Sequence, residues 1–334
     1  MRRENNDSTP ERKPGGISRL RWILSGVLLF IAVTATVFWA YGSRGIPASP
    51  DPTAPPPESS AGEADPEITA PEEIRWDPPE HITPEGGVRN ILLVGQDRRP
   101  GEERGRADSI VLCSLNENTN TLTLVSLLRD TYVPIPGYPD DRINAAFAFG
   151  GLELLTETVE QDFGVTLNGS FAVDFDGFTR AVSAVGPLEL EITAAEAEYL
   201  NSAGGWSLTE GTNALDEMQL LSYVRSRSTG QGDFDRTQRQ RKVILAAFQK
   251  LRALSVTELF TLAERTLPYV ETDLPTAEVL DLVFVAASRH MTTGESLRLP
   301  ADGAYSDRTI RGMAVLVPDL AENSLLLRQY LYGE

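Results

Sequence analysis

The sequence has very few of the side chains that most often serve as nucleophiles, zinc ligands or covalent cross-links. Its 334 residues include one cysteine, Cys113, and two histidines, His81 and His290. These numbers argue against a disulfide framework, a cysteine zinc site and a Cys–His nucleophile pair. Lysine occurs only three times, and no S-x-x-K motif is present. Any chemistry must therefore depend on carboxylates, arginines, hydroxyls or a bound hard metal ion.

The overall composition is that of a globular protein. Residues of the AVILMFWYC set make up 41% of the chain, and the 27 glycines raise the apolar share to about 49%. The length allows one large domain or two smaller ones. The net charge is −18, but residues 222–242 carry six basic residues and only two acidic ones. A positive segment on an acidic protein predicts an anionic ligand.

Residues 22–43 form an uncharged stretch that is long enough to cross a membrane. At about 1.5 Å per residue, a helix of this length spans a hydrocarbon core of about 30 Å. The basic residues gather before it: Arg2, Arg3, Arg12, Lys13, Arg19 and Arg21. We therefore expect a cytoplasmic basic tail at 1–21, a transmembrane helix at 22–43 and the rest of the chain outside the cell membrane. A cleaved signal peptide is the alternative, but the stretch is long for one.

Residues 44–87 are expected to form an extracytoplasmic linker that carries no catalytic group. Eleven of the 22 prolines fall in 45–87, together with ten acidic residues and one arginine. Such a segment buries too little apolar surface to offset its ordering entropy, and proline keeps it extended. His81 lies within it, which leaves His290 as the one histidine of the predicted domain at 88–334.

From residue 88 onward, apolar residues recur with the periods of strands and helices. Strands are predicted at 90–95, 109–115, 121–127, 169–175 and 188–193, with a hairpin loop at 116–120. Helices are predicted around 152–159 and at 177–186, 235–254, 257–269, 276–289 and 319–332. Cys113 lies in mid-strand and is expected to be a buried apolar residue. Alternating strands and helices imply an α/β fold with helices on both faces of a sheet.

Three clusters of acidic and basic residues stand at the ends of predicted strands. They are Gly95–Arg99, Arg104–Ser109 and Leu128–Thr131. Charged loops at strand ends are candidate ligand sites in α/β folds, although each cluster alone could equally be solvated or brace a turn. Carboxylates suit Mg²⁺, which takes one or two of them together with phosphate oxygens. Arginine forks match the geometry of phosphate.

A fourth cluster gives a stronger signal. Arg236 is followed by Arg239 and Gln240 at helical spacings of three and four, and Arg225 and Arg227 precede them. We expect these side chains to share one face near a helix N-terminus, where free N–H groups and the helix dipole also favour an anion. No nucleic acid is expected, because the segment lies outside the membrane and few aromatic residues interleave it.

Taken together, the motifs resemble the LytR-CpsA-Psr family. They are G-x-D-x-R at 95–99, R-x-D-[ST] at 106–109, S-x-x-R-D-T at 126–131, I-N-A-A-[FY]-A-[FY]-G-G at 143–151, F-x-G-F at 175–178, Y-V-R-x-R at 223–227 and D-F-x-R-x-x-R-Q at 233–240. All seven occur in the family's order, and a single N-terminal span is usual there. The chain departs from the pattern at several positions: Asp235 and Glu217 replace glycines, Leu128 a proline, Arg142 a lysine, and Phe147 and Phe149 tyrosines.

The resemblance implies a three-layer αβα domain with a mixed central β-sheet and a Mg²⁺-dependent phosphotransferase activity. Such enzymes move a glycan phosphate from a polyprenyl-pyrophosphate carrier to peptidoglycan, generally the 6-hydroxyl of muramic acid. By the same resemblance, Asp97 and Asp108 hold Mg²⁺, and Asp233 orients the arginines. The residues implied to bind pyrophosphate are Arg106, Arg129, Arg225, Arg227, Arg236 and Gln240, with Arg129, Asp108 and Arg227 as the catalytic set. Asp108 and Asp130 are the candidates for a general base.

Two other functions use the same residue types. A metal-dependent hydrolase would employ the same carboxylates with water as the acceptor, and would release free glycan phosphate. A non-catalytic envelope module would bind polyprenyl phosphate without turnover. Loss of an arginine or aspartate from the clusters would favour such a module, but all of them are present.

Overall fold

A computed structural model describes residues 74–81, 86–98, 104–226, 233–288 and 291–333. The predicted transmembrane segment 22–43 lies outside these residues. Within the described part of the chain, no helix combines the length and apolarity that a bilayer crossing requires.

The domain is built on a mixed seven-stranded sheet, with strand order β10-β3-β2-β1-β6-β9 and β11 also paired with β3. Its long strands are β1 (Val88–Asp97), β2 (Arg106–Asn116) and β3 (Thr121–Leu127), which pair antiparallel. Strand β6 (Gly169–Val173) runs parallel to β1, and β9 (Val270–Thr272) runs antiparallel to β6. The short strands β10 (Thr292–Thr293) and β11 (Leu297–Leu299) run parallel to β3.

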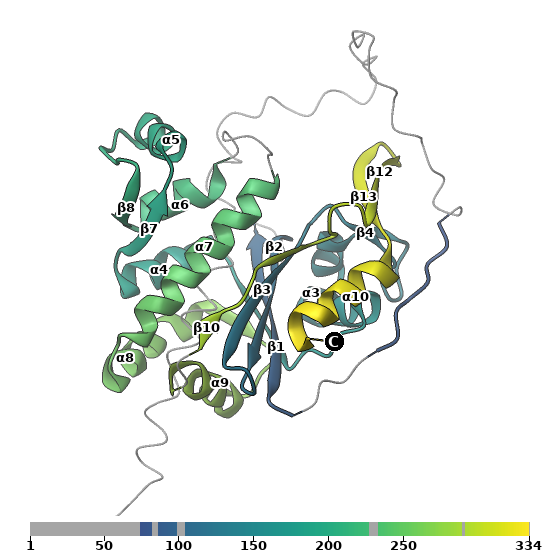
Figure 1. The fold of residues 1–334 in the computed structure, drawn as a ribbon, viewed down its shortest axis with the longest axis horizontal. Coiled ribbons are helices and arrows are strands. Elements are labelled where there is room, and N and C mark those ends of the chain that lie inside the picture. Colours follow the sequence, from purple (N-terminus) through teal and green to yellow (C-terminus); the bar gives the residue numbers. More distant parts are fainter. Residues whose placement is uncertain (1–73, 82–85, 99–103, 227–232, 289–290, 334) are drawn as a thin grey trace, which may run out of the picture.

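Alternation along the central strands produces two hydrophobic cores, one on each face of the sheet. In β1, Ile91 and Leu93 face one core, and Leu92 and Val94 face the other, as the two-residue period of a strand requires. The first core is covered by α4 (Phe175–Val185), α6 (Glu217–Arg225), α7 (Asp233–Arg252), α8 (Val256–Thr266) and α9 (Thr276–Ser288). The second is covered by α3 (Ile143–Phe163) and α10 (Leu320–Tyr332) (Figure 1).

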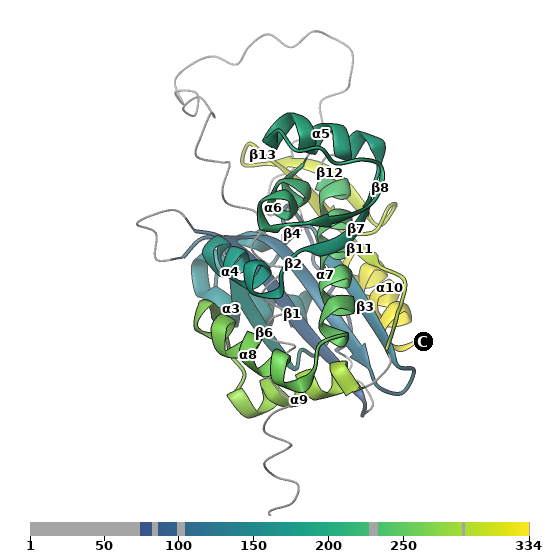
Figure 2. The ribbon, with the colours of Figure 1, turned by 90° about the vertical axis from the view of Figure 1, so that its left-hand side faces the viewer.

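Smaller elements surround this centre. Strands β7 (Leu188–Ile192) and β8 (Gly211–Leu215) form a ribbon beside α5 (Ala194–Gly204), above α7 in Figure 2. Strands β4 (Tyr132–Val133) and β5 (Asp141–Arg142) pair after β3, and β12 (Tyr305–Ile310) and β13 (Met313–Pro318) form a hairpin. A short 3₁₀ turn, η2 (Leu267–Tyr269), leads into β9.

The structure confirms the predicted mixed α/β organisation around a central sheet. The expected strands at 90–95, 109–115 and 121–127 are the cores of β1, β2 and β3, and Cys113 is buried in the middle of β2. The helices α5 and α6 and the ribbons β4–β5 and β12–β13 were not predicted. The end of the expected linker contacts the domain, because Trp76 Nε1 donates a hydrogen bond to Asp140 Oδ2 at 2.6 Å.

Candidate functional site

The predicted charge clusters meet at one edge of the sheet. Strand β1 ends at Asp97, directly opposite Arg106 at the start of the antiparallel β2. Strand β3 ends at Leu127, opposite Ile110, and leads straight into Arg129 and Asp130. Three segments that are well separated in sequence therefore bring their charged side chains to the same edge. This placement agrees with the expectation drawn from the strand ends.

A β-bulge sets the position of Asp108. Gly95 pairs with Ser109 and Gln96 pairs with Ala107, so Asp108 is the extra residue between two pairs. The bulge puts Ala107 on the α3 side of the sheet, while Ser109 Oγ donates to Gln240 Oε1 of α7 at 3.2 Å. Bulges of this kind interrupt the alternation of a strand and re-aim one side chain. Here the re-aimed side chain is the carboxylate of Asp108.

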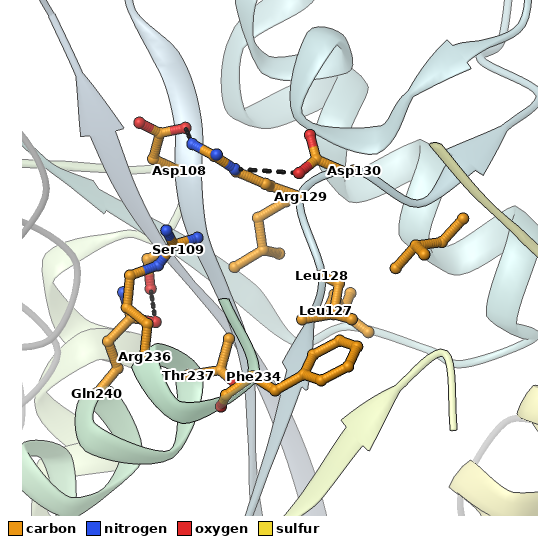
Figure 3. A pocket seen from close by; sticks show the side chains of 12 residues that line it. Asp108, Ser109, Leu127, Leu128, Arg129, Asp130, Phe234, Arg236, Thr237 and Gln240 are labelled. Carbon is orange, nitrogen blue, oxygen red and sulfur yellow. Dashed lines mark hydrogen bonds and ion pairs between the residues drawn. The ribbon is translucent and has the colours of Figure 1, made fainter. Parts of the chain in front are cut away.

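Asp108 belongs to a chain of ion pairs that runs through Arg129, Asp130 and Arg142. Arg129 Nη1 donates to Asp108 Oδ1 at 3.0 Å, and its Nε lies 3.4 Å from Asp130 Oδ2 (Figure 3). Arg142 Nη1 in turn donates to Asp130 Oδ1 at 3.1 Å. Because aspartates and arginines alternate, each guanidinium is held in place by at least one carboxylate.

Burial governs the protonation of Asp108. Only 10% of its side chain is exposed, and this desolvation raises the pKa of its carboxyl despite the opposing effects of Arg129 and Arg236. Asp130 adds a smaller increase through like-charge repulsion. An additional positive charge at this position would therefore stabilise the ionised carboxylate.

A large polar cavity of about 960 Å³ opens at this edge of the sheet. Its lining residues come from β1, β2, the loop before β2, the segment after β3, and the first turns of α3; they are Asp97, Arg104, Gly105, Arg106, Asp108, Arg129, Arg142, Asn144, Ala148 and Phe149. Four arginines and two aspartates give the lining a formal excess of two positive charges. Such a cavity suits a dianion with several oxygen atoms.

A kink in α3 lets Arg104 reach this cavity. Gly151 has φ +71° and ψ −154° inside the helix, a combination that only glycine adopts readily. A Cβ atom on Gly151 would lie 3.2 Å from Arg104 Nε. The Gly-Gly pair of the I-N-A-A motif therefore separates a short first segment, which borders the cavity, from the longer remainder that covers the core.

A second, smaller cavity of about 40 Å³ lies beside the first and shares Asp108 and Arg129 with it. Arg236, Thr237 and Gln240 of α7 border it, together with Phe234 (Figure 3). Arg236 and Gln240 are only 2% and 3% exposed. Arg236 and Gln240 therefore border the same cavity as Asp108 and Arg129, which also line the large cavity.

Arg239 behaves differently from the expectation that it shares a face with Arg236. Its Nε donates to Glu196 Oε1 of α5 at 2.9 Å, and its Nη1 donates to the carbonyl oxygen of Ser226. Both side chains are nearly buried, at 3% and 8% exposure. Arg239 thus ties α5 and the end of α6 to α7.

The remaining predicted site residues take the following positions. Arg225 is the last residue of α6 and is half-buried, Asp233 is the first residue of α7, and Asp235 lies in the first turn of α7. Arg227 lies outside the described residues. Sequence reasoning gave no individual role to four further residues of the lining: Arg104, Arg142, Asn144 and Phe149. Arg104 lay in one of the predicted charge clusters, Arg142 was noted only as a departure from the family pattern, and the other two belong to the I-N-A-A string.

The carboxylates of the large cavity suit a magnesium ion. Among the described residues, no group of three or more histidine, cysteine, aspartate and glutamate side chains is placed to hold a metal. Asp97 and Asp108 nevertheless border one cavity and supply hard oxygen ligands. Mg²⁺ commonly uses one or two carboxylates and takes its other ligands from water and substrate phosphates, so this donor set fits it.

Comparison with known proteins gives three matches that agree with one another. The model of the LytR_cpsA_psr family matches residues 66–327. TagU of Oceanobacillus iheyensis, named a polyisoprenyl-teichoic acid–peptidoglycan teichoic acid transferase, is 35% identical over 216 residues, which are 62% of this chain and 66% of that protein. The regulatory protein MsrR of Staphylococcus aureus is 30% identical over 222 residues, 66% of this chain and 67% of that one.

A solved structure shares the fold. The LytR-CPS2A-psr family protein YwtF (TagT), with bound octaprenyl pyrophosphate lipid, superimposes with a TM-score of 0.58. The superposition covers 75% of this chain and 93% of that chain, at 24% sequence identity. At this identity the likeness establishes a common architecture.

Proposed function

Because the chain belongs to the LytR-CpsA-Psr family, we propose that it transfers a glycan phosphate from a polyprenyl-pyrophosphate carrier to peptidoglycan. The observation that carries the proposal is the large cavity, whose four arginines and two aspartates leave an excess of two positive charges. A pyrophosphate diester is a dianion with many acceptor oxygens and no donors, which is the ligand that such a lining complements. The name of TagU and the octaprenyl pyrophosphate lipid bound to YwtF (TagT) support the same substrate class.

In the proposed reaction, an acceptor hydroxyl attacks the phosphorus atom that carries the glycan. A new P–O bond forms to the acceptor, and the bond from that phosphorus to the bridging oxygen breaks. Polyprenyl phosphate leaves with the electron pair, and the hydroxyl proton is released. The acceptor in this proposal is the 6-hydroxyl of muramic acid. Such an in-line transfer depends mainly on positioning and charge stabilisation, with little covalent help from the protein.

The ion-paired arginines supply that stabilisation. Arg129 is held by Asp108 and Asp130, so its guanidinium is fixed before substrate binds, and little reorganisation is needed as charge moves to the leaving oxygen. Arg106 and Arg236 approach from β2 and α7, where each borders one of the two cavities. Arg225, Arg227 and Gln240 complete the proposed pyrophosphate contacts, with Asp233 orienting the arginines.

Asp97 and Asp108 would hold Mg²⁺ in this site. When bound, the ion would neutralise charge on the pyrophosphate oxygens. We further propose that the N-terminal segment 22–43 anchors the protein in the cell membrane, with the catalytic domain on the extracytoplasmic side. This topology would place the cavity where lipid-linked glycans meet the cell wall.

Product analysis tests the proposal. The full-length protein in detergent is incubated with a synthetic polyprenyl-pyrophosphate glycan, Mg²⁺ and peptidoglycan fragments, and the products are identified by mass spectrometry. We expect a glycan-phosphate–muropeptide adduct whose rate of formation falls about 10²- to 10³-fold in Arg129→Ala, the loss expected when one fixed donor to developing charge is removed.

Arg89→Ala is the matched control. Arg89 is also ion-paired, to Glu117 at 3.2 Å, but it lies near the opposite end of β1, roughly 25 Å from the site at the rise of a strand. The control should transfer glycan at the rate of the native protein. Free glycan phosphate in the presence of acceptor would instead identify a hydrolase, and bound but unchanged lipid would identify a binding module.

A further inference from the structure

Two exposed aromatic rings stack against each other where the large cavity opens to solvent. Phe149, which borders the cavity, is 40% exposed, and Tyr138 is 46% exposed. Their ring centroids lie 4.9 Å apart, with an interplanar angle of 14°. Because Tyr138 covers one face of the Phe149 ring, the exposed surface of Phe149 comes from its other face and its edges. The pair therefore presents a flat apolar surface beside an otherwise charged lining.

The two aromatic residues lie on a turn and on a helix. Tyr138 follows a turn in which Tyr138 N donates to Ile135 O at 3.0 Å, with Pro136 and Gly137 as the central residues. Gly137 has φ +74°, and proline followed by a glycine with positive φ is the pattern of a type II turn. Phe149 lies on the short segment of α3 before the Gly151 kink. Both aromatic residues thus lie on hydrogen-bonded backbone, one after a turn and one on a helix.

A buried amide that borders the same cavity points to a ligand with hydrogen-bond donors. Asn144 lies in the first turn of α3, borders the same cavity and is only 3% exposed. Its Oδ1 atom is buried and has no hydrogen-bond partner among the described residues. An unpaired buried acceptor is costly, so such atoms usually meet a donor in the functional complex. Pyrophosphate offers only acceptors and cannot be that partner.

We propose that Phe149, braced by Tyr138, is the platform on which a pyranose ring of the glycan stacks, and that Asn144 accepts a hydrogen bond from that sugar. A pyranose ring has an apolar C–H face and a rim of hydroxyl donors, and these features match the two parts of the site. A prenyl chain would leave Asn144 unsatisfied and would bury the arginine lining against hydrocarbon. The inference rests on the proposed function, because the pyrophosphate bound by the arginines brings the sugar to the rings.

The experiment compares ligands that differ only in the sugar. Binding to the full-length protein in detergent is measured by calorimetry with a short-chain prenyl diphosphate, with the same lipid bearing one N-acetylglucosamine, and with a soluble disaccharide fragment of peptidoglycan. The variants are Phe149→Ala, Phe149→Leu, Phe149→Tyr and Asn144→Ala. Tyr330→Ala is the control, since Tyr330 is an exposed aromatic residue of α10, 37% exposed.

We expect Phe149→Ala and Phe149→Leu to bind a sugar-bearing ligand about three- to tenfold more weakly, which is the range for loss of an aromatic contact. Asn144→Ala should bind the same ligand more weakly than the native protein does. Phe149→Tyr and Tyr330→Ala should bind it as the native protein does, and the sugar-free diphosphate should bind equally well to every variant. Weakening confined to the glycolipid supports the glycan sugar as the occupant. Weakening confined to the peptidoglycan fragment would assign the rings to the acceptor and so contradict the proposal.

Two results would overturn the platform. One is equal weakening of the sugar-free diphosphate, which would show that the rings contact the prenyl chain or the phosphates. The other is unchanged affinity of Phe149→Ala for both sugar-bearing ligands. Failure of the proposed function is a separate result, because it is read from the product assay. A native protein that binds the glycolipid through Phe149 but forms no glycan-phosphate–muropeptide adduct would refute transfer and leave the platform supported.

Discussion

The buried pair of Arg239 and Glu196 is predicted to hold α5, α6 and α7 together, and Arg239→Met tests this. Glu196 uses one oxygen to cap α5, since Thr193 N donates to its Oε2 at 3.0 Å, and the other to accept from Arg239 at 2.9 Å. The substitution removes the guanidinium but keeps most of the apolar volume. It leaves a carboxylate with 8% exposure without its ion-pair partner, and also removes the hydrogen bond from Arg239 to the carbonyl oxygen of Ser226.

Breaking a buried ion pair from one side costs about 3–5 kcal/mol, because the partner charge stays desolvated. For a domain of this size, each kcal/mol lowers Tm by about 2–4 °C, so we expect a decrease of about 6–20 °C. The control, Gln249→Met, changes an exposed uncharged side chain of the same helix and should change the free energy of unfolding by less than about 0.5 kcal/mol. Urea unfolding followed by circular dichroism measures both.

The ion pair of Arg239 and Glu196 also predicts how the stability of the protein depends on pH. Burial alone would raise the pKa of Glu196, but the hydrogen bonds from Thr193 and Arg239 and the charge of Lys242 outweigh it, and the pKa lies below the ordinary value of 4.5. A lowered pKa gives stability that is complete above the ordinary value and is lost as the pH falls through the lowered one. The native protein should therefore lose part of its stability in acid, and Arg239→Met should lose less.

A double-mutant cycle decides whether the two side chains act on each other. Arg239→Met and Glu196→Gln are measured singly and together, and we expect a coupling free energy of at least about 1 kcal/mol. A coupling below about 0.3 kcal/mol, or a loss in Arg239→Met no larger than that of Gln249→Met, would refute the assignment. Transfer should fall in Arg239→Met as well, because Ser226 directly follows Arg225 in the chain.

Two further predictions concern α3. Burial raises the pKa of Asp162 to about 8, so folding takes up a proton, and stability should fall as the pH rises from about 4 to 8. Asp162→Asn should abolish that decline, and equal pH dependence of the urea midpoints in both proteins would contradict this. Gly151→Ala should cost about 1–3 kcal/mol, since alanine is strained at φ +71°. Gly86→Ala, with open space around its Cβ position, should be neutral in the same unfolding assay.

The central strands were predictable because their burial is continuous and their ends are marked. β1 is a run of buried residues from Asn90 to Gln96, and a hydrophobic run ended by charged residues gives a clear signal. The β12–β13 hairpin gave no such signal. Its two-residue turn has positive φ at both Arg311 and Gly312, and arginine is rare in the left-handed conformation that this turn demands.

The site was predictable in its charges and less so in its shape. Asp97, Asp108 and Arg129 stand next to recognisable strand ends, so their convergence followed from the topology of an α/β sheet. The bulge at Asp108 could not be predicted, because it depends on the register between β1 and β2. The aromatic platform depends on a stacking contact between two elements, and no local pattern encodes such a contact.

The separate roles of Arg236 and Arg239 show where helical spacing stops being informative. At about 100° per residue, positions three apart differ by roughly 60° around the helix axis, which is close enough to be counted as one face. Helix α7, however, packs against the sheet on one side and lies close to α5 and α6 on another, so 60° is enough to send one side chain to each neighbour. Arg236 turns toward Asp108, where its charge opposes the burial that raises the pKa of the carboxyl, and Arg239 turns toward Glu196. Arg236 is thus placed to bind an anion, and Arg239 is placed to stabilise the fold. The elements that pack against α7 decide which arginine takes which role.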